Sequence, residues 1–146
     1  MQESEIIEIL PIDRYLPQKR PFLMVDEIIK GGEKVCKTHF IVRQENPLFR
    51  GETFTEAGLI ENIAQTAAAH IGYVEIHIRK TNLIRVGVIA AIKSLDIFRL
   101  PHRGEDLTTT VEETMSGVMN MSIYNAEIKI GEELIAKGEI RVAITQ

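Results

Sequence analysis

Hydrophobic and polar positions alternate along most of the chain, and one central stretch departs from this pattern. Residues 24–30 (MVDEIIK) and 33–42 (EKVCKTHFIV) have the pattern of strands, and the glycine pair between them is typical of a hairpin turn. Further strands are predicted where Thr, Val and Ile are frequent or alternate with polar residues, at 84–98, 106–114, 119–130 and 132–145. The pattern predicts two strands, a long interruption, and then about four strands.

The interruption is predicted to be a long helix. Residues 57–74 carry one formally charged side chain, Glu61, among alanines, glycines and branched aliphatic residues. Thr53 is followed three residues later by a glutamate, which is capping-box spacing and predicts a helix start near Thr53. Gly72 is a plausible helix end, so residues 73–80 either extend the helix or leave it.

A helix with so few charges is best buried by a sheet that wraps around it. The predicted fold class is therefore α+β, with a curled antiparallel sheet around one long central helix. The chain has no repeats, low-complexity tracts or Ser/Pro-rich linkers. We expect residues 1–146 to form a single domain.

The two sides of the predicted helix differ in kind. At about 100° per residue, one broad apolar face is formed by Leu59, Ile60, Ile63, Ala67, His70 and Ile71. Glu61 lies roughly opposite, on a stripe of mostly small residues that contains Ala57, Gly58, Gln65, Ala68 and Gly72. This stripe is either a solvated face with an exposed acid, or a closely packed channel or dimer surface.

Charge and composition remove several classes of function. The 146 residues include 17 Lys and Arg against 21 Asp and Glu, a net charge of −4, so the chain lacks the basic footprint of a nucleic-acid-binding protein. A single cysteine, Cys36, forms no intrachain disulfide, and no His/Cys spacing indicates a metal site. We expect a cytoplasmic protein without a secretory signal or membrane span, because the N-terminus is acidic and residues 57–74 contain several polar side chains.

Four stretches resemble motifs of the β-hydroxyacyl-(acyl-carrier-protein) dehydratases, the hot-dog enzymes of fatty-acid synthesis. They occur in the family's order and are LPQKRPFLMVDEI (16–28), NPLFRGETF (46–54), AGLIENIAQTAAA (57–69) and FRLPHRGEDL (98–107). The central helix and the downstream RVG look closest to the short dehydratase-like branch associated with aryl-polyene-type polyketide clusters. The resemblance implies a hot-dog fold.

The resemblance also implies roles for particular residues. In the family, a loop histidine acts as base at the α-carbon, a helix acid handles the departing β-hydroxyl, and N–H groups at the helix start polarise the thioester carbonyl. By position, the helix acid is Glu61 and the retained glutamine is Gln65. The polarising N–H groups come from the first turn around Gly58 and Leu59. Glu52 stands where the family has its catalytic histidine.

Other candidates are less direct. Gln18 replaces a histidine of the N-terminal motif, and with Phe22 it is a candidate for substrate binding. Two carboxylates in a dry site raise the pKa of one of them, so Glu52 and Glu61 are a possible acid/base pair. Alternatively, Glu52 is simply an acid favoured near a helix start.

The four histidines are expected to differ in environment. His39 lies on a predicted strand, where it either enters the site or is an ordinary core or surface histidine. We expect His70 to be a hydrogen-bonded core residue, His77 to lie in the loop after the helix, and His102 to be an exposed turn residue.

Three functions remain open. The leading hypothesis is a dehydratase acting on a 3-hydroxyacyl chain carried by the phosphopantetheine of acyl carrier protein or coenzyme A, with no cofactor of its own. The second is a thioesterase that uses Glu61 with Gln65 and Thr66. The third is an inactive acyl-binding partner that completes a heterodimer with a paralogous dehydratase.

Two kinds of partner are expected. A carrier protein is acidic, so a basic rim is predicted, and its candidates are Lys19, Arg20, Arg99 and Arg103. A single sheet around one helix leaves a sheet edge open, so we expect at least a homodimer.

Overall fold

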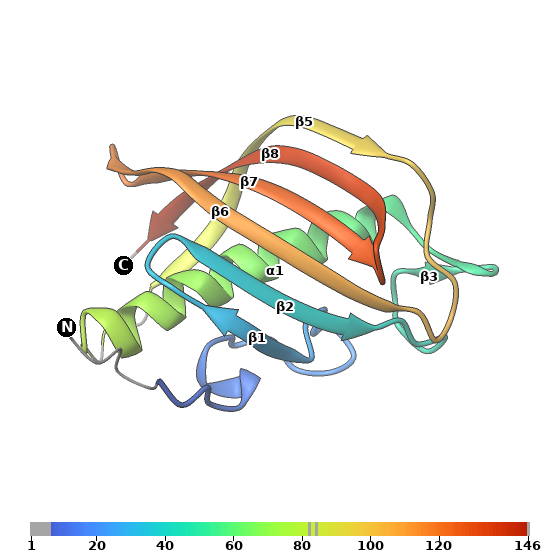
Figure 1. Cartoon of the computed structure of the whole chain (residues 1–146), viewed down its shortest axis with the longest axis horizontal. Coiled ribbons are helices and arrows are strands. Elements are labelled where there is room, and N and C mark those ends of the chain that lie inside the picture. The colour runs from blue at the N-terminus through green and yellow to red at the C-terminus, as the bar shows by residue number, and fades with distance from the viewer. Residues whose placement is uncertain (1–6, 82, 84, 146) are drawn as a thin grey trace.

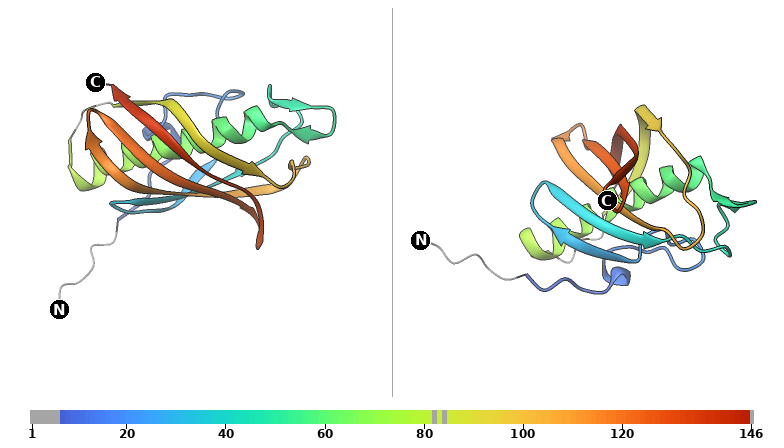
Figure 2. Two further views of the ribbon diagram at one scale, coloured as in Figure 1. Left: turned by 90° about the horizontal axis from the view of Figure 1, so that it is seen from above. Right: turned by 45° about the vertical axis from the view of Figure 1, so that its right-hand side comes forward.

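The computed structural model describes residues 7–81, 83 and 85–145 (Figure 1). A six-stranded antiparallel sheet has the order β1-β2-β6-β7-β8-β5. Its strands are β1 (Glu27–Gly31), β2 (Val35–Ile41), β5 (Val86–Ile97), β6 (Asp106–Val118), β7 (Met121–Ile130) and β8 (Glu133–Thr145). The sheet curls around α1 (Glu56–Tyr73), as the views in Figure 2 show. The predicted α+β class and hot-dog arrangement are therefore confirmed.

The predicted strands are all present. The first two pair as a hairpin from Glu27↔His39 to Gly31↔Cys36, with the glycine pair at the turn. The four strands after the helix also match, although buried and exposed positions alternate regularly in only part of them. On β7, for example, Ser122, Tyr124, Ala126 and Ile128 are buried and the intervening residues are more exposed.

The helix begins later than the capping-box pattern predicts. Thr53 lies in β4 (Thr53–Phe54), which pairs with β3 (Phe49–Arg50) in a small separate hairpin. The N-cap is Thr55, whose side chain accepts a hydrogen bond from the Gly58 N–H at 3.3 Å. Both the N–H and the hydroxyl of Thr55 donate to the Leu48 carbonyl, at 3.0 and 2.7 Å. Hairpin pairing therefore moves the helix start by two residues.

The far end of the helix continues beyond Gly72. A π-helical turn, η2 (Val74–Ile78), follows α1 directly, so residues 73–78 extend the helix. His77 lies within this turn rather than in a loop, and its Nε2 is 2.7 Å from the Tyr15 hydroxyl. Tyr15 follows a short 3-10 turn, η1 (Ile12–Arg14), and this contact ties the N-terminal segment to the end of the helix.

The broad apolar face of α1 forms the core with the inner face of the sheet. Five of its predicted members are buried and one, Ile60, is half-buried. His70 is 1% exposed and its Nδ1 is 2.8 Å from the Tyr124 hydroxyl, while its Nε2 is 3.0 Å from the Glu33 carbonyl. Burial lowers the pKa of His70. The expectation of a hydrogen-bonded core histidine is confirmed.

Part of the stripe of small residues is closely packed, and there the chain itself covers it. A Cβ on Gly72 would lie 3.0 Å from the Tyr15 carbonyl oxygen, so the N-terminal segment passes directly over this position. Further along the stripe, the backbone of Phe22 and Met24 contacts the side chain of Gln65. The N-terminal segment therefore runs beside the stripe and passes close to Glu61 before it enters β1.

Candidate active site

Glu61 is held by a glutamine one turn further along α1. Gln65 is 1% exposed, and its amide nitrogen donates to Glu61 Oε1 at 3.0 Å and to the Phe22 carbonyl at 2.9 Å. Its oxygen accepts the Met24 N–H at 2.6 Å. Because every polar atom of the amide has a partner, its orientation is fixed. The Glu61 carboxylate is half-buried and held in place from one side.

Asn62 completes this arrangement, and its role was not anticipated from the sequence. Its side chain is fully buried, donates to the Met24 carbonyl at 2.7 Å, and accepts the Thr109 hydroxyl at 2.5 Å. Gln65 and Asn62 together satisfy both the N–H and the carbonyl of Met24. The sequence signal that could have indicated this role is an amide side chain directly after Glu61 in a helix with few other polar residues.

Thr66 faces the sheet rather than Glu61. Its hydroxyl donates to the Asn62 carbonyl at 2.8 Å and lies 2.8 Å from the Thr38 hydroxyl of β2. Thr66 is fully buried. It is therefore already hydrogen-bonded on the side away from the carboxylate, which weakens the thioesterase hypothesis that uses it.

The start of α1 offers different N–H groups from those expected. The Gly58 N–H bonds Thr55 Oγ1, and a Cβ on Gly58 would lie 2.5 Å from the Phe54 ring. Leu59 is fully buried in the core and its N–H donates to the Thr55 carbonyl. Neither residue presents a free N–H. Within the described part of the chain, the first-turn N–H groups without a hydrogen-bond partner belong to the exposed residues Glu56 and Ala57.

Glu52 lies at the exposed turn of the β3–β4 hairpin, which projects beyond the sheet at the end where α1 begins (Figure 1). No hydrogen bond or ion pair joins it to Glu61 among the residues described within this single chain. A pocket of about 360 Å³ lies beside it, lined by Gln44, Phe49, Gly51, Glu52, His102 and Arg103. His102 Nδ1 is 3.3 Å from the Glu52 carbonyl oxygen.

His39 lies on the outer face of the sheet. Its neighbours Thr38 and Phe40 are buried against α1, whereas its ring nitrogens are each 3.1 Å from a carboxylate, of Asp106 and of Glu27. Burial alone would lower the pKa of His39, but these two carboxylates outweigh it and raise the pKa. His39 is therefore a surface histidine held by two carboxylates, which is the second of the two environments considered for it from the sequence.

The two candidates from the N-terminal motif are placed differently. Phe22 is 64% exposed, and its carbonyl accepts a hydrogen bond from Gln65, the residue that also holds Glu61. Gln18 is half-buried, and among the described residues its side-chain oxygen is buried without a hydrogen-bond partner.

The predicted basic rim is only partly available. The guanidinium of Arg99 binds both oxygens of Glu105 at 2.8 Å and also contacts Glu133 at 2.8 Å, which raises the pKa of Arg99 and lowers that of Glu105 to about 2. Arg20 is paired with Asp26 at 2.7 Å. Lys19 and Arg103 are exposed, and Arg103 donates to the amide of Gln44. Arg99 is thus engaged within the chain.

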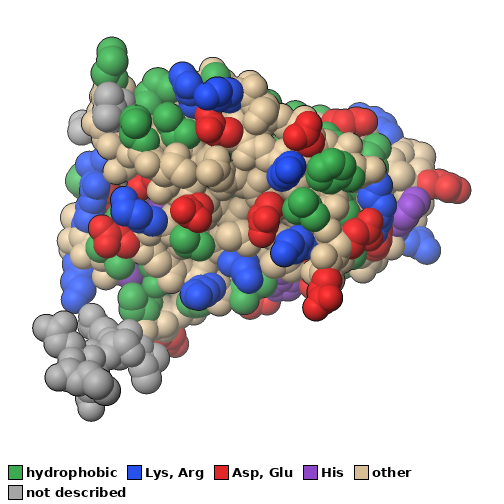
Figure 3. Space-filling view, turned by 45° about the horizontal axis from the view of Figure 1, so that its top comes forward, with side chains coloured by type: hydrophobic (Ala, Val, Ile, Leu, Met, Phe, Trp, Pro, Cys, Tyr) green, Lys and Arg blue, Asp and Glu red, His purple; other side chains and the backbone are tan. Residues whose placement is uncertain are grey.

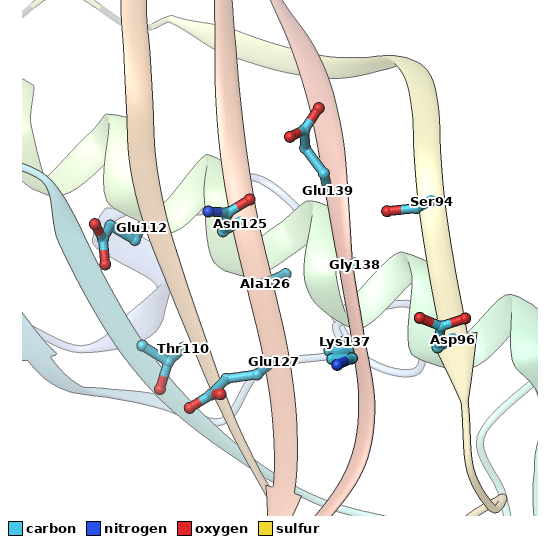
Figure 4. Close-up of a pocket in the computed structure, with 10 residues that line it drawn as sticks. All are labelled: Ser94, Asp96, Thr110, Glu112, Asn125, Ala126, Glu127, Lys137, Gly138 and Glu139. Carbon is cyan, nitrogen blue, oxygen red and sulfur yellow. The ribbon is translucent and has the colours of Figure 1, made fainter.

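A second hollow lies on the outer face of the sheet, with α1 on the other side (Figure 4). Its volume is about 480 Å³, and its lining includes four carboxylates with one lysine: Asp96, Glu112, Glu127, Glu139 and Lys137. Such a surface is unsuited to an apolar acyl chain. Charges of both signs are interspersed over the face in Figure 3, without one dominant basic patch.

The described residues offer no metal centre, because no group of three or more His, Cys, Asp or Glu side chains is placed to hold an ion. No helix in the described part of the chain is long and apolar enough to cross a membrane.

Comparison with known proteins identifies a matching family. Residues 10–146 match the sequence model of the ApeP-like family, described as ApeP dehydratase. The 3-hydroxyacyl-[acyl-carrier-protein] dehydratase FabZ of Clostridioides difficile is 30% identical over 149 aligned positions, which cover 97% of this chain and 99% of that protein.

Solved structures share the fold. The dehydratase heterocomplex ApeI:P from Xenorhabdus doucetiae has a TM-score of 0.79 at 15% identity, covering 95% of this chain and 93% of that chain. A hypothetical thioesterase protein with coenzyme A from Streptococcus pneumoniae has a TM-score of 0.60 at 17% identity, covering 82% and 84%. The family match extends over nearly the whole chain, and the chain belongs to the ApeP-like dehydratase family of hot-dog proteins.

Proposed function

We propose that this protein removes water from a (3R)-3-hydroxyacyl chain carried as a thioester on acyl carrier protein, in fatty-acid or polyketide metabolism. The observation that carries the proposal is the half-buried Glu61 on α1, held at 3.0 Å by a glutamine whose other polar atoms are fixed. A carboxyl group that is held in one orientation on a largely apolar helix is suited to protonating a departing hydroxyl group. The matched FabZ proteins are named for this reaction.

The start of α1 supplies a second element of the reaction. Elimination needs an acidic α-proton, which becomes more acidic when the thioester carbonyl is polarised. The N–H groups of Glu56 and Ala57 point out of the first helical turn, at the positive end of the helix dipole. We assign carbonyl polarisation to these two groups, in place of Gly58 and Leu59. The elimination breaks the C2–H and C3–O bonds and releases water without net oxidation or reduction, so it requires no redox group.

We further propose that the working unit is a homodimer that receives acyl carrier protein at Lys19 and Arg103. Both side chains are exposed, and neither is paired with an acid among the described residues. The related ApeI:P assembly is a heterocomplex, so a paralogous dehydratase is an alternative second subunit. The buried Cys36 thiol, whose pKa is raised by burial to about 12, suits a reducing cytoplasm.

The test is direct. The purified chain is mixed with a 3-hydroxyacyl thioester of acyl carrier protein, and the enoyl absorbance is followed. We expect turnover, and a fall of at least about 100-fold in kcat for Glu61→Gln, because that variant removes the proton donor while keeping its shape. Glu45→Gln, on an exposed loop residue, is the matched control. Full activity of Glu61→Gln would rule out this site.

The same assay separates the other functions. A thioesterase would release free thiol from saturated acyl thioesters that lack a β-hydroxyl. An inactive partner would show neither activity alone and would become active only when mixed with a paralogous dehydratase. Glu52 in place of the family's histidine is the observation that favours this second alternative.

A further inference from the structure

We propose that His102 is the general base of the dehydration, in place of the Glu52 side chain that occupies the family's histidine position. This inference rests on the proposed function. His102 belongs to the loop between β5 and β6, a different segment from the one where the family's motif has its histidine. The fold nevertheless brings it to the same hairpin, because Thr53 and His102 pair as an antiparallel bridge.

The loop that carries His102 is held rigidly. Arg99 and Glu105 close its two ends with a bidentate ion pair at 2.8 Å. Glu105 Oε1 also accepts the His102 N–H at 2.8 Å. The other side is tied to the end of β2, where the Val42 carbonyl accepts the Gly104 N–H at 2.8 Å. Charged hydrogen bonds of this kind fix a turn in one geometry, so the backbone of His102 is positioned in advance.

The hairpin then sets the tautomer of the neutral ring. The Phe54 N–H donates to the Pro101 carbonyl at 2.9 Å, which places the Glu52 carbonyl 3.3 Å from His102 Nδ1. A carbonyl oxygen can only accept, so in the neutral ring Nδ1 carries the hydrogen and Nε2 keeps its lone pair. The tautomer with a basic Nε2 is the one that abstracts a proton.

The other three histidines are unsuited to this role. His39 is bonded at both nitrogens to carboxylates on the outer face. His70 is bonded at both nitrogens inside the core. His77 lies in η2, at the opposite end of α1, and is bonded to Tyr15. Within the described chain, His102 is the histidine whose Nε2 has no partner.

Chemistry also favours His102 over Glu52. Imidazole is the commonest general base in enzymes, and it is a stronger base than a carboxylate. Both residues line the same pocket of about 360 Å³, which has room for a group of the substrate beside the ring. The base is thereby supplied from the neighbouring loop, and the hairpin contributes the Glu52 backbone carbonyl.

The proposed step balances as follows. In the proposed homodimer, His102 Nε2 of one protomer takes the proton from C2 of the acyl chain, and the C2–H electron pair forms the C2=C3 double bond. The C3–O bond breaks, and the hydroxyl leaves as water with the proton of the carboxyl of Glu61 of the partner subunit. The imidazolium then loses its proton to solvent and the Glu61 carboxylate regains one, so both groups return to their starting state. No oxidant or reductant is involved.

His102→Asn is the main test, because its amide keeps a donor near the position of Nδ1 but has no base. We expect kcat for 3-hydroxyacyl carrier protein to fall at least about 100-fold, with an unchanged melting temperature. In His102→Ala, added imidazole should restore part of the activity by entering the open pocket. The matched control is His77→Asn, which makes the same substitution at the far end of α1 and should keep wild-type kcat.

The outcomes separate this proposal from the function on which it rests. If Glu61→Gln is inactive while His102→Asn keeps wild-type kcat, His102 is not the base and the proposed function stands. If Glu52→Gln loses activity and His102→Asn does not, the base is the Glu52 carboxylate. If the wild-type chain does not dehydrate the substrate, both proposals are overturned. Loss in His102→Asn, with imidazole rescue of His102→Ala, supports the assignment.

Discussion

At the scale of single residues, Gln65 connects the N-terminal segment to the acid. Gln65→Ala would leave the buried Met24 N–H without an acceptor and free the Glu61 carboxylate. We expect a loss of about 1–3 kcal/mol in the free energy of unfolding, the usual cost of one unsatisfied buried group, together with lower activity. Urea unfolding monitored by circular dichroism measures the first. Gln44→Ala, at an exposed position, should change stability by less than about 0.5 kcal/mol.

His39 makes stability depend on pH. Its pKa is raised in the folded state, so the protonated ring stabilises the fold fully below the unfolded value of about 6.5. That contribution is lost as the pH rises through the folded pKa. His39→Asn should therefore be less stable than wild type at pH 6, and the difference should shrink by pH 8. Comparing the two proteins at each pH cancels the opposite contributions of His70 and His77, whose pKa values are lowered by burial. A constant difference would contradict the prediction.

Some site residues were predictable from sequence because their partners are close in the chain. Glu61 and Gln65 are one helical turn apart, and both the periodicity and the family motif indicate them. Asn62 bonds Met24 and Thr109, which are 38 and 47 residues away, so its role depends on how the sheet is assembled. His102 is placed beside Glu52 by pairing across 50 residues. The spacing of residues along the sequence therefore predicts neither the contacts of Asn62 nor the position of His102.

At the scale of elements, the packing of Gly58 against Phe54 positions α1 and the β3–β4 hairpin relative to each other. Gly58→Ala would raise helix propensity by up to about 1 kcal/mol, but the new Cβ would lie 2.5 Å from the Phe54 ring. We expect a net destabilisation of about 1–3 kcal/mol from the overpacked contact. In Phe54→Leu/Gly58→Ala, the smaller side chain should relieve this contact. Urea unfolding should then show a loss smaller than the sum of the two single variants, whereas additive losses would mean that the two residues are not coupled.

The elements were predicted where one local pattern was decisive. Alternation, or a high content of Thr, Val and Ile, located the six strands of the main sheet. The start of the helix was placed two residues early, because Thr53 and Glu56 fit a capping box while Thr53 pairs with Arg50 in the β3–β4 hairpin. A two-residue strand is too short to show alternation. A single-domain organisation stays a prediction.

At the scale of the whole molecule, the order of the sheet leaves two edges, β1 and β5. β5 pairs with β8 on one side, and in the described chain its other side is unpaired. Val88 and Ile92 on this strand are 54% and 41% exposed, which is unusual for branched aliphatic residues on a long edge strand. These features favour β5 as the edge that meets a second copy.

Replacing one aliphatic residue on each edge tests this assignment. Ile92→Lys on β5 would place a charge inside the proposed interface, so we expect the particle to fall to the 16.5 kDa of one chain in light scattering. Ile29→Lys changes the same residue type on β1, where Ile29 is 47% exposed, and should leave the dimer intact. Dehydration should be lost in the β5 variant and kept in the β1 variant, because the proposed working unit is the dimer. A dimer that survives Ile92→Lys but dissociates with Ile29→Lys would place the interface on the opposite edge.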